Sequence, residues 1–394
     1  MAIVAPRSLL EPTSDEEAMI LATVRKLVAD KVAPRAAEID EKGEFPFDLK
    51  ELFAKNDLMG IPFPAEYGGL GASFVTYVKV VEEIAKACAS SSLVIAVQEL
   101  GALAILIGGN EAQKKKYIPK IASGEWISAY ALTESGSGSD AAGSMRCRAE
   151  KKGDKYILNG TKVWITHGGV ADVVCVFAVT DPTKGPSGIS AFIVEKTFPG
   201  FNVGKLEKKM GIRGSPTVEL VFDNCEVPVE NLIGPEGEGF RTAMKVLDKS
   251  RPGIAAQAVG IAQGALDYAT QYAKDRIAFG KPIGQQQGIQ FMLADMRTEV
   301  EAARLLLYEA ARKCDEAAPD VTVWAAMAKL KAGDVAMSVT TDAVQILGGF
   351  GYSVEYPVER MMRDAKITQI YEGTQQIQRI VIARGMVGKA KGAK

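Results

Sequence analysis

The sequence predicts an α+β multidomain fold in which a compact β domain lies between two helical domains. Three observations predict it: apolar residues recur at helical spacing in the first third, β-branched and aromatic residues dominate from about residue 129, and helical spacing returns after about residue 234. At 394 residues the chain is too long for one ordinary core. We expect a helical domain over 1–128, a β domain over 129–234 and a helical bundle over 235–394.

The N-terminal domain is expected to begin with an amphipathic helix. Ser14 and Glu17 have the spacing of a capping box, and apolar residues follow them at helical spacing. Pro34 should end this helix, because proline breaks the hydrogen-bond ladder of a helix interior. Further helical stretches are expected within 74–108 and 111–124.

The middle domain is expected to be an antiparallel sheet, either barrel-like or sandwich-like, because no helical stretch separates its strand-like runs. The pair Asn159-Gly160 lies between two such runs and is typical of a hairpin turn. The C-terminal domain contains long helical runs with few breakers, which are typical of a four-helix bundle.

Composition excludes several classes of protein. Lys and Arg total 47 against 48 for Asp and Glu, so no general field attracts nucleic acid or an anionic membrane. The five cysteines form no CxxC pair, which predicts neither a zinc site nor a disulfide framework. The N-terminus lacks the basic region and long apolar core of a signal peptide, and no stretch is expected to approach the ~18 apolar residues of a membrane span. We therefore expect a cytoplasmic protein without a membrane span.

Two glycine-containing segments could face a ligand. Residues 130–143 place hydroxyl side chains among glycines, where the backbone can approach a ligand closely, although a surface loop is the commoner outcome. The hydroxyl-bearing residues there are Thr133, Ser135, Ser137 and Ser139. Residues 345–360 contain a glycine cluster that follows a helical run rather than a strand, which disfavours a Rossmann site and is equally compatible with a helix C-cap.

Residues with recognisable chemistry lie in three other places. Arg276 and Gln287 flank a Phe279-Gly280 turn, and arginine suits phosphate recognition, although a solvated arginine is commoner. Trp164 could cover a planar ligand or lie in the core. The only histidine, His167, excludes a mechanism that needs two histidines and is more often structural in such a stretch.

Glu372 is the most informative acidic residue. It lies between uncharged neighbours in "QIYEGTQQIQR", with Gly373 directly behind it. Most glutamates in helical regions are solvated, but a buried carboxylate has a raised pKa and becomes a better general base. The residues alone therefore predict a helical and β protein with several ligand-facing turns and one candidate base.

Six collinear motifs together resemble the acyl-CoA dehydrogenase family over nearly the whole chain. They are "YALTESGSGSD", "WIT", "LDKSRPGIAA", "DRIAFGKPI", "QILGGFGY" and "RDAKITQIYEGTQQIQR". The short- and medium-chain members, butyryl-CoA dehydrogenase among them, are the most similar. The resemblance implies the same order of helical, β and four-helix-bundle domains, bound FAD, a homotetramer and a role in fatty acid β-oxidation.

The resemblance also implies roles for particular residues. Glu372 would remove the α-proton of an acyl-CoA thioester while the β-hydrogen leaves as hydride to the flavin, which gives a trans-2-enoyl-CoA, and electrons would pass to electron-transferring flavoprotein. The Glu372 N–H and the flavin ribityl would stabilise the developing enolate. Acyl-CoA contacts are implied for Ser139, Asp248, Arg251 and Gly373.

The implied FAD site is assembled from three groups. The first lines the flavin, with Thr133 and Thr166 near its ring system, and comprises Tyr130, Leu132, Thr133, Gly138, Ser139, Trp164, Ile165 and Thr166. The second group would hold the pyrophosphate and adenosine of FAD. It comprises Arg276, Phe279 and Gln287, together with Gln345, Ile346, Gly348 and Gly349 from a neighbouring subunit. Thr374 and Gln376 would complete the site.

Four positions depart from the patterns of particular relatives. Ser250 stands where some relatives place the base, which leaves this role to Glu372. Ser92 stands where glutaryl-type relatives carry an arginine, which disfavours a dicarboxylyl substrate. His167 follows "WIT" where asparagine is common. Glu99 is unexpected beside the acyl tail; we expect an exposed or ion-paired side chain, and the alternative is a residue that tunes the pocket for a polar or branched acyl group.

Two other functions stay open on the same scaffold. One is an acyl-CoA oxidase that returns electrons to oxygen. The other is a flavin-binding assembly protein without turnover, which the retained Glu372 disfavours.

Overall fold

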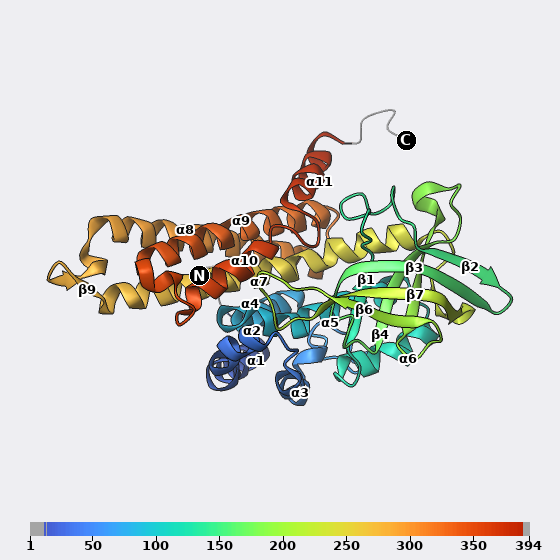
Figure 1. The fold of residues 1–394 in the computed structure, drawn as a ribbon, viewed down its shortest axis with the longest axis horizontal. Helices are drawn as coiled ribbons and strands as arrows, with labels where there is room; N and C mark the ends of the chain where they lie inside the picture. The colour runs from blue at the N-terminus through green and yellow to red at the C-terminus, as the bar shows by residue number, and fades with distance from the viewer. Residues whose placement is uncertain (1–11, 13, 389–394) are drawn as a thin grey trace, which may run out of the picture.

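The computed structural model describes residue 12 and residues 14–388. Its elements follow the expected order of helices, strands and helices, which confirms the fold class. The sheet occupies one end of the molecule, long helices extend to the other, and the N-terminal helices pack beside both (Figure 1). The predicted domain limits follow the changes of element type but stay a prediction.

The N-terminal region is helical throughout. Its α-helices are α1 (Asp15–Leu27), α2 (Ala36–Lys42), α3 (Phe47–Lys55), α4 (Phe74–Ala87), α5 (Ala89–Gly108) and α6 (Glu111–Ala122). Ser14 caps α1 as expected, since its Oγ accepts a hydrogen bond from the Glu17 backbone N–H at 3.1 Å. The expected stop at Pro34 is wrong: a π-helical turn (Val28–Val32) and a 3-10 turn (Ala33–Arg35) lead directly into α2. Such a change of helical pitch accommodates proline, which has no N–H to donate.

The middle region forms one sheet in the order β6-β7-β3-β2-β4-β5-β8, with β1 paired to β4. Its strands are β1 (Ser128–Ala131), β2 (Arg148–Lys152), β3 (Lys155–Thr166), β4 (Val173–Val179), β5 (Ile189–Glu195), β6 (Phe201–Leu206), β7 (Thr217–Pro228) and β8 (Leu232–Ile233). Most pairs are antiparallel as expected, but β4 runs parallel to β1 and to β2.

The hairpin expected at Asn159-Gly160 is wrong. Asn159 pairs with Arg148 of β2 inside the continuous strand β3, and the register shifts between Leu158 and Gly160 on the β7 side. A Cβ at Gly160 would lie 2.7 Å from the Cα of Cys147, so glycine serves close strand contact and a bulge here rather than a turn.

The C-terminal region is built around three long helices. Its elements are α7 (Gly239–Asp275), the hairpin strands β9 (Ile277–Ala278) and β10 (Lys281–Pro282), α8 (Gln287–Asp315), α9 (Val321–Leu347), α10 (Pro357–Ile367) and α11 (Gln375–Val387). Small residues let α7 approach α4 closely: a Cβ at Gly260 would lie 2.4 Å from the Glu82 carbonyl oxygen.

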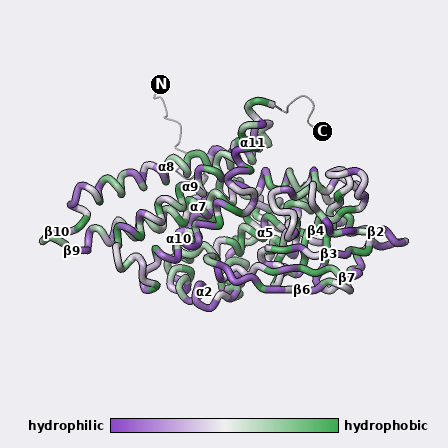
Figure 2. The backbone as a smooth tube through the Cα atoms, turned by 45° about the horizontal axis from the view of Figure 1, so that its top comes forward, coloured by the Kyte–Doolittle hydropathy of each residue, from purple (hydrophilic) through white to green (hydrophobic). Residues whose placement is uncertain are grey.

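Helix α5 lies in the interior between the sheet and the bundle (Figure 2). It packs against α4, α7, β1 and β4. By length and apolar composition α5 is the one helix of the described chain that could cross a membrane, so the expectation that no stretch comes near that length is wrong. Most of its residues are buried inside the protein, as in a core helix.

Candidate functional site

Glu372 lies in a non-helical turn between α10 and α11. Its backbone φ is 52°, and that of Gly373 is 92°. The turn is held by Gln378, whose Nε2 donates to the carbonyl oxygens of Glu372 at 3.1 Å and Gly373 at 2.9 Å. A left-handed glutamate is uncommon and costs energy, so the surrounding contacts must impose it. This conformation is consistent with a functional role for Glu372.

The Glu372 carboxylate is bonded by a residue far away in the sequence. Ser250 of α7 donates its hydroxyl to Glu372 Oε2 at 2.6 Å. Burial raises the pKa of Glu372, and the Ser250 hydrogen bond, Arg251 and Lys329 lower it only in part. A carboxylate in this condition can accept a proton from a weakly acidic carbon more readily than a solvated one.

The predicted acyl-CoA contacts Asp248 and Arg251 lie on the same helix as Ser250. Arg251 Nη1 donates to Asp248 Oδ1 at 2.7 Å, and Thr322 donates its hydroxyl to Asp248 Oδ2 at 2.7 Å. Arg251 Nε is buried and has no hydrogen-bond partner within the described chain. Arg251 therefore keeps one donor without a partner among the described residues, and its charge lowers the pKa of Glu372.

The first group of predicted FAD residues is brought together at the sheet. The end of β3 lies beside the segment after β1, because the Val163 N–H donates to the Thr133 carbonyl oxygen at 2.9 Å. Trp164 has a φ of 61° and leaves 57% of its surface exposed, so it is not a core aromatic. A Cβ at Gly138 would meet no atom within 4 Å. An open glycine loop thus lies near an exposed aromatic ring.

Several residues of this group can offer only their backbone to a ligand. The side chains of Leu132 and Ile165 are buried. Ser137 is turned inward, where its hydroxyl donates to the Asp140 carbonyl oxygen at 2.9 Å. The exposed side chain of Ser139 remains available, whereas Thr133 and Thr166 are half-buried.

His167 closes the tight turn after β3. It is buried against Phe45, with ring centroids 4.9 Å apart, and its Nε2 has no hydrogen-bond partner in the part of the chain that the structure describes. Burial lowers its pKa to about 3. His167 is therefore a neutral ring at ordinary pH and fits the structural role expected for it.

The second group lies at the far end of the helical bundle. Phe279 and Gly280 form the expected turn of the β9–β10 hairpin, and Phe279 is 95% exposed. The Arg276 guanidinium lies 5.2 Å from the centre of the Phe350 ring. Gly348 is the C-cap of α9, which is the helix-cap alternative considered for this glycine cluster, and Gly349 is exposed. Gln287 and Gln345 are also exposed, whereas Ile346 is buried.

The two groups cannot meet within one chain. The β9–β10 hairpin and the strands β1 and β3 lie at opposite ends of the molecule (Figure 1). Thr374 and Gln376 lie between them at the start of α11, where Thr374 Oγ1 accepts a hydrogen bond from the Ile377 N–H at 3.3 Å. One ligand that touches both groups would need a second copy of the chain.

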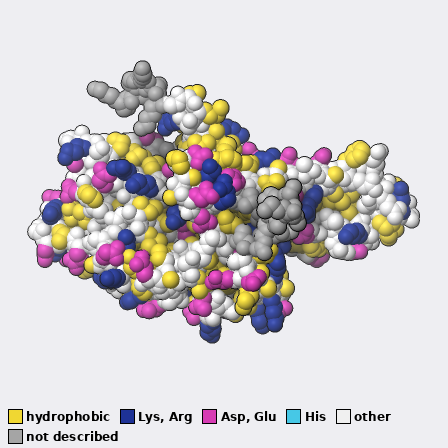
Figure 3. Space-filling model, turned by 180° about the vertical axis from the view of Figure 1, so that it is seen from behind, with side chains coloured by type: hydrophobic (Ala, Val, Ile, Leu, Met, Phe, Trp, Pro, Cys, Tyr) yellow, Lys and Arg dark blue, Asp and Glu magenta, His cyan; other side chains and the backbone are white. Residues whose placement is uncertain are grey.

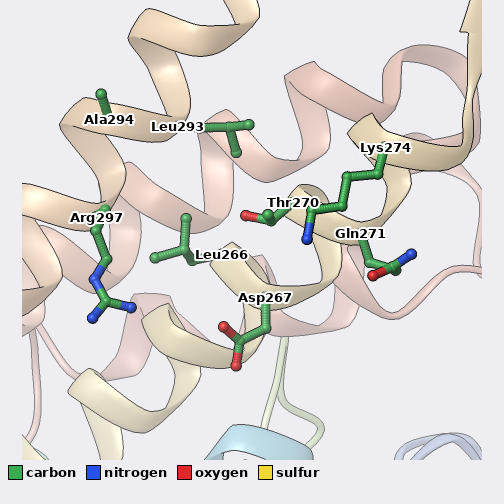
Figure 4. Close-up of a pocket in the computed structure, with 8 residues that line it drawn as sticks. All are labelled: Leu266, Asp267, Thr270, Gln271, Lys274, Leu293, Ala294 and Arg297. Carbon is green, nitrogen blue, oxygen red and sulfur yellow. The ribbon is translucent and has the colours of Figure 1, made fainter. Parts of the chain in front are cut away.

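A surface cleft between α7 and α8 contains none of the predicted site residues (Figure 4). It is lined by Leu266, Asp267, Thr270, Gln271, Lys274, Leu293, Ala294 and Arg297. In Figure 4 the apolar Leu266 and Leu293 face each other across it, with polar and charged side chains around them. We assign it no part in the chemistry.

Sequence reasoning missed two residues that position the Glu372 turn. Lys329 of α9 is 1% exposed and donates from Nζ to the Gly373 carbonyl oxygen at 2.6 Å and to Gln375 Oε1 at 3.3 Å. Gln378 holds the two carbonyls already described. A signal existed for Lys329, since it lies among alanines and a glycine at helical spacing, where a core side chain is expected.

The positions that depart from relatives have different outcomes. Ser92 is buried and donates its hydroxyl to the Ala89 carbonyl oxygen at 2.8 Å. Glu99 is only 2% exposed, and its carboxylate oxygens have no partner among the described residues, so the expectation of an exposed or ion-paired side chain is wrong.

Glu372 is thus a half-buried carboxylate held in a turn of the helical C-terminal region, and the β region carries an open glycine loop and an exposed Trp164. Three family models match the chain: the N-terminal domain of acyl-CoA dehydrogenase over residues 14–125, its middle domain over 129–225 and its C-terminal domain over 237–387. The chain belongs to the acyl-CoA dehydrogenase family and is thus an oxidoreductase.

Individual relatives agree with this assignment. The chain is 50% identical over 369 residues to the short-chain-specific acyl-CoA dehydrogenase of Clostridium acetobutylicum. The aligned residues make up 93% of this chain and 97% of the Clostridium protein. The structure of butyryl-CoA dehydrogenase from Megasphaera elsdenii matches with a TM-score of 0.93 at 46% identity, over 96% of this chain and 99% of that one. A third match comes from a structure described in work on the electron transferring flavoprotein of Acidaminococcus fermentans and flavin-based electron bifurcation. The TM-score is 0.94 at 48% sequence identity, and the match covers 96% of this chain and 99% of that chain.

Proposed function

We propose that this chain is an FAD-dependent acyl-CoA dehydrogenase that converts an acyl-CoA thioester to the trans-2-enoyl-CoA, with Glu372 as the base. The observation that carries the proposal is the Glu372 carboxylate itself. It is bonded to Ser250 at 2.6 Å, has a raised pKa and occupies a left-handed turn that several side chains enforce.

The proton-transfer half of the reaction follows from these contacts. Glu372 accepts the α-proton, and its burial keeps the carboxylate basic enough to do so. The Ser250 hydroxyl fixes which oxygen is free, because Oε2 is already occupied. The positive φ at Glu372 directs its backbone out of the helical path, where its N–H can serve the thioester carbonyl. Exclusion of water strengthens both effects.

FAD, when bound, would accept the β-hydrogen as a hydride. The chain offers it residues of suitable chemistry: the exposed Trp164 for a planar ring, the open Gly138 loop for close backbone approach and Arg276 for a phosphate. Ser139, Asp248, Arg251 and Gly373 are proposed for the acyl-CoA, with the unpartnered Arg251 Nε as a free donor.

A homotetramer, which the family resemblance implies, is part of the proposal, and the separation of the two groups of FAD residues within one chain supports at least a second copy. Large apolar side chains are exposed at the narrow end of the molecule, where Figure 3 shows apolar atoms, and this end is the proposed place for a second copy. Those near the hairpin and the end of α9 are Ile277, Phe279, Phe291, Phe350, Tyr352 and Val354. Such an accumulation of exposed apolar side chains is typical of an interface.

The proposed electron acceptor is an electron-transferring flavoprotein, the protein studied together with one of the matched chains. The proposed substrate is a short or medium acyl-CoA, and the proposed setting is cytoplasmic β-oxidation. The relatives named for short-chain and butyryl substrates support this range.

Anaerobic titration with acyl-CoA esters of increasing chain length tests the proposal. Absorbance of the oxidised flavin should bleach in a chain-length-dependent way in the wild-type protein and not in Glu372→Gln. If no ester bleaches a fully flavin-loaded protein, the proposal is wrong. Under air, stoichiometric peroxide without an added acceptor would instead identify an acyl-CoA oxidase.

A further inference from the structure

A carboxylate more deeply buried than that of Glu372 has no part in the mechanism described so far. Glu99 of α5 is 2% exposed, and neither of its carboxylate oxygens has a hydrogen-bond partner among the residues that the structure describes. Buried polar groups are almost always paired, since an unpaired one keeps the full cost of its lost hydration. Glu99 therefore needs an explanation.

Other buried acids of this chain are paired. Glu82 accepts from Arg304 Nε at 2.8 Å and from the Tyr308 hydroxyl at 2.8 Å. Glu134 accepts from Lys162 Nζ at 2.8 Å and from backbone N–H groups. These carboxylates are structural, because their neighbours neutralise and bond them. Among the described residues Glu99 has no such hydrogen bond or ion pair, and Lys249 acts on it only as a nearby charge, which distinguishes it from a carboxylate that fixes the fold.

Glu99 lies within electrostatic range of Glu372, the proposed base. Its carboxyl is close enough to interact electrostatically with Glu372 and with Lys249 of α7. The Tyr77 hydroxyl of α4 is influenced by both Glu99 and Glu372, is fully buried and has no hydrogen-bond partner in the described ranges. It also lies 3.0 Å from the position that a Cβ would take at Gly253 of α7. Glu99 and Tyr77 are thus buried polar side chains without hydrogen-bond partners in the described chain, both within electrostatic range of Glu372.

The chemistry of these groups restricts the ligand. Burial raises the pKa of Glu99 well above its usual value, against the opposing charge of Lys249, which favours the protonated carboxyl. In that form the carboxyl can both donate and accept a hydrogen bond. An alkyl end beside it would leave the carboxyl unpaired. A carboxylate end would be repelled by an ionised Glu372. A neutral hydroxyl can pair with Glu99 and Tyr77 at once.

We propose that Glu99 and Tyr77 form a polar end of the acyl pocket that binds an acyl-CoA carrying a hydroxyl group away from the thioester. The inference rests on the proposed function and names its substrate class. Sites that bond a substrate hydroxyl discriminate strongly against the analogue without it, by about 10,000-fold or more. Glu99 is thus assigned as a specificity-determining residue, distinct from the base.

The test compares kcat/KM for butyryl-CoA and hexanoyl-CoA with that for their ω-hydroxylated counterparts in the flavin-loaded protein. Wild type should prefer the hydroxylated ester of one pair. Glu99→Leu should reverse the preference, Glu99→Gln should retain most of it because an amide still donates and accepts, and Tyr77→Phe should reduce it. KM should change more than kcat, since the hydroxyl does not react.

The outcomes separate this inference from the proposed function. If plain esters reduce the flavin but hydroxylation brings no advantage in either pair, the inference alone is wrong. An unchanged ratio in a folded Glu99→Leu variant overturns it as well. If neither kind of ester reduces the flavin, the proposed function fails and the inference falls with it.

Discussion

Replacing Lys329 by methionine should disturb the base without touching it. Lys329 is buried, and its Nζ donates to the Gly373 carbonyl oxygen at 2.6 Å, directly behind Glu372. Its positive charge also lowers the pKa of Glu372. Methionine preserves the length and much of the volume of the side chain but removes both the donor and the charge.

Two magnitudes follow for Lys329→Met. Loss of the hydrogen bonds leaves Gln375 Oε1 without this donor, which should cost ~1–3 kcal/mol of unfolding free energy at high pH. Loss of the charge raises the pKa of Glu372, so the acidic limb of the kcat/KM profile should move to higher pH.

A change in the pH dependence of stability should accompany these effects. Burial lowers the pKa of Lys329 from 10.5 to about 7. Between these values the unfolded chain binds more protons than the folded one, so wild-type stability should rise with pH by up to about 1.4 kcal/mol per unit. Lys329→Met should lose this slope.

Flavin reduction by acyl-CoA and urea unfolding, each measured from about pH 6 to about pH 10, provide the assay. Lys331→Met is the matched control, because Lys331 lies on the same helix but pairs with Glu299 at the surface. Surface pairs contribute little, so this control should resemble wild type in both measurements. Identical profiles for the two variants would refute the reasoning.

Three further predictions concern single ionisable or polar groups. Ser250→Ala should raise the pKa of Glu372 and shift the kcat/KM profile to higher pH, because a hydrogen bond to the charged form is lost; an unshifted profile counts against the contact. His167→Phe should make the protein less sensitive to acid. The free energy of unfolding of wild type should fall by up to about 1.4 kcal/mol per pH unit as pH falls from 6.5 toward about 3, because only the unfolded chain takes up the proton. Equal losses of unfolding free energy in wild type and variant, measured in urea between neutral and mildly acidic pH, would contradict this. Glu99→Gln should become more stable relative to wild type as pH rises above 4.5, because the raised pKa of the buried carboxyl makes its ionisation in the folded protein unfavourable. A difference in unfolding free energy between the two proteins that is constant with pH would disprove the burial argument.

The sequence predicted features that depend on local patterns. The order of helical and β regions, the cap at Ser14 and the Phe279-Gly280 turn all depend on residues near one another in the chain, and the structure confirms each. Pro34 and Asn159 were misread because strong local signals were overridden: a change of helical pitch absorbs the proline, and strand pairing on both sides absorbs the asparagine.

The site was less accessible from the sequence because its contacts join distant residues. Ser250 and Glu372 are 122 positions apart, and no local pattern predicts their hydrogen bond. The left-handed backbone of Glu372 is equally hidden, since only the contacts of Gln378 and Lys329 impose it. The burial of Glu99 depends on how α5 packs, so composition alone favoured an exposed acid.

The most direct test of the central claim is anaerobic stopped-flow reduction of the flavin by butyryl-CoA in wild type and in Glu372→Gln at equal FAD content. Glutamine preserves shape and can still interact with Ser250, but it cannot accept the α-proton. We predict rapid bleaching in wild type and a loss of at least ~1000-fold in the variant, with binding of butyryl-CoA retained. Reduction of the variant at the wild-type rate would contradict the assignment of Glu372 as the base.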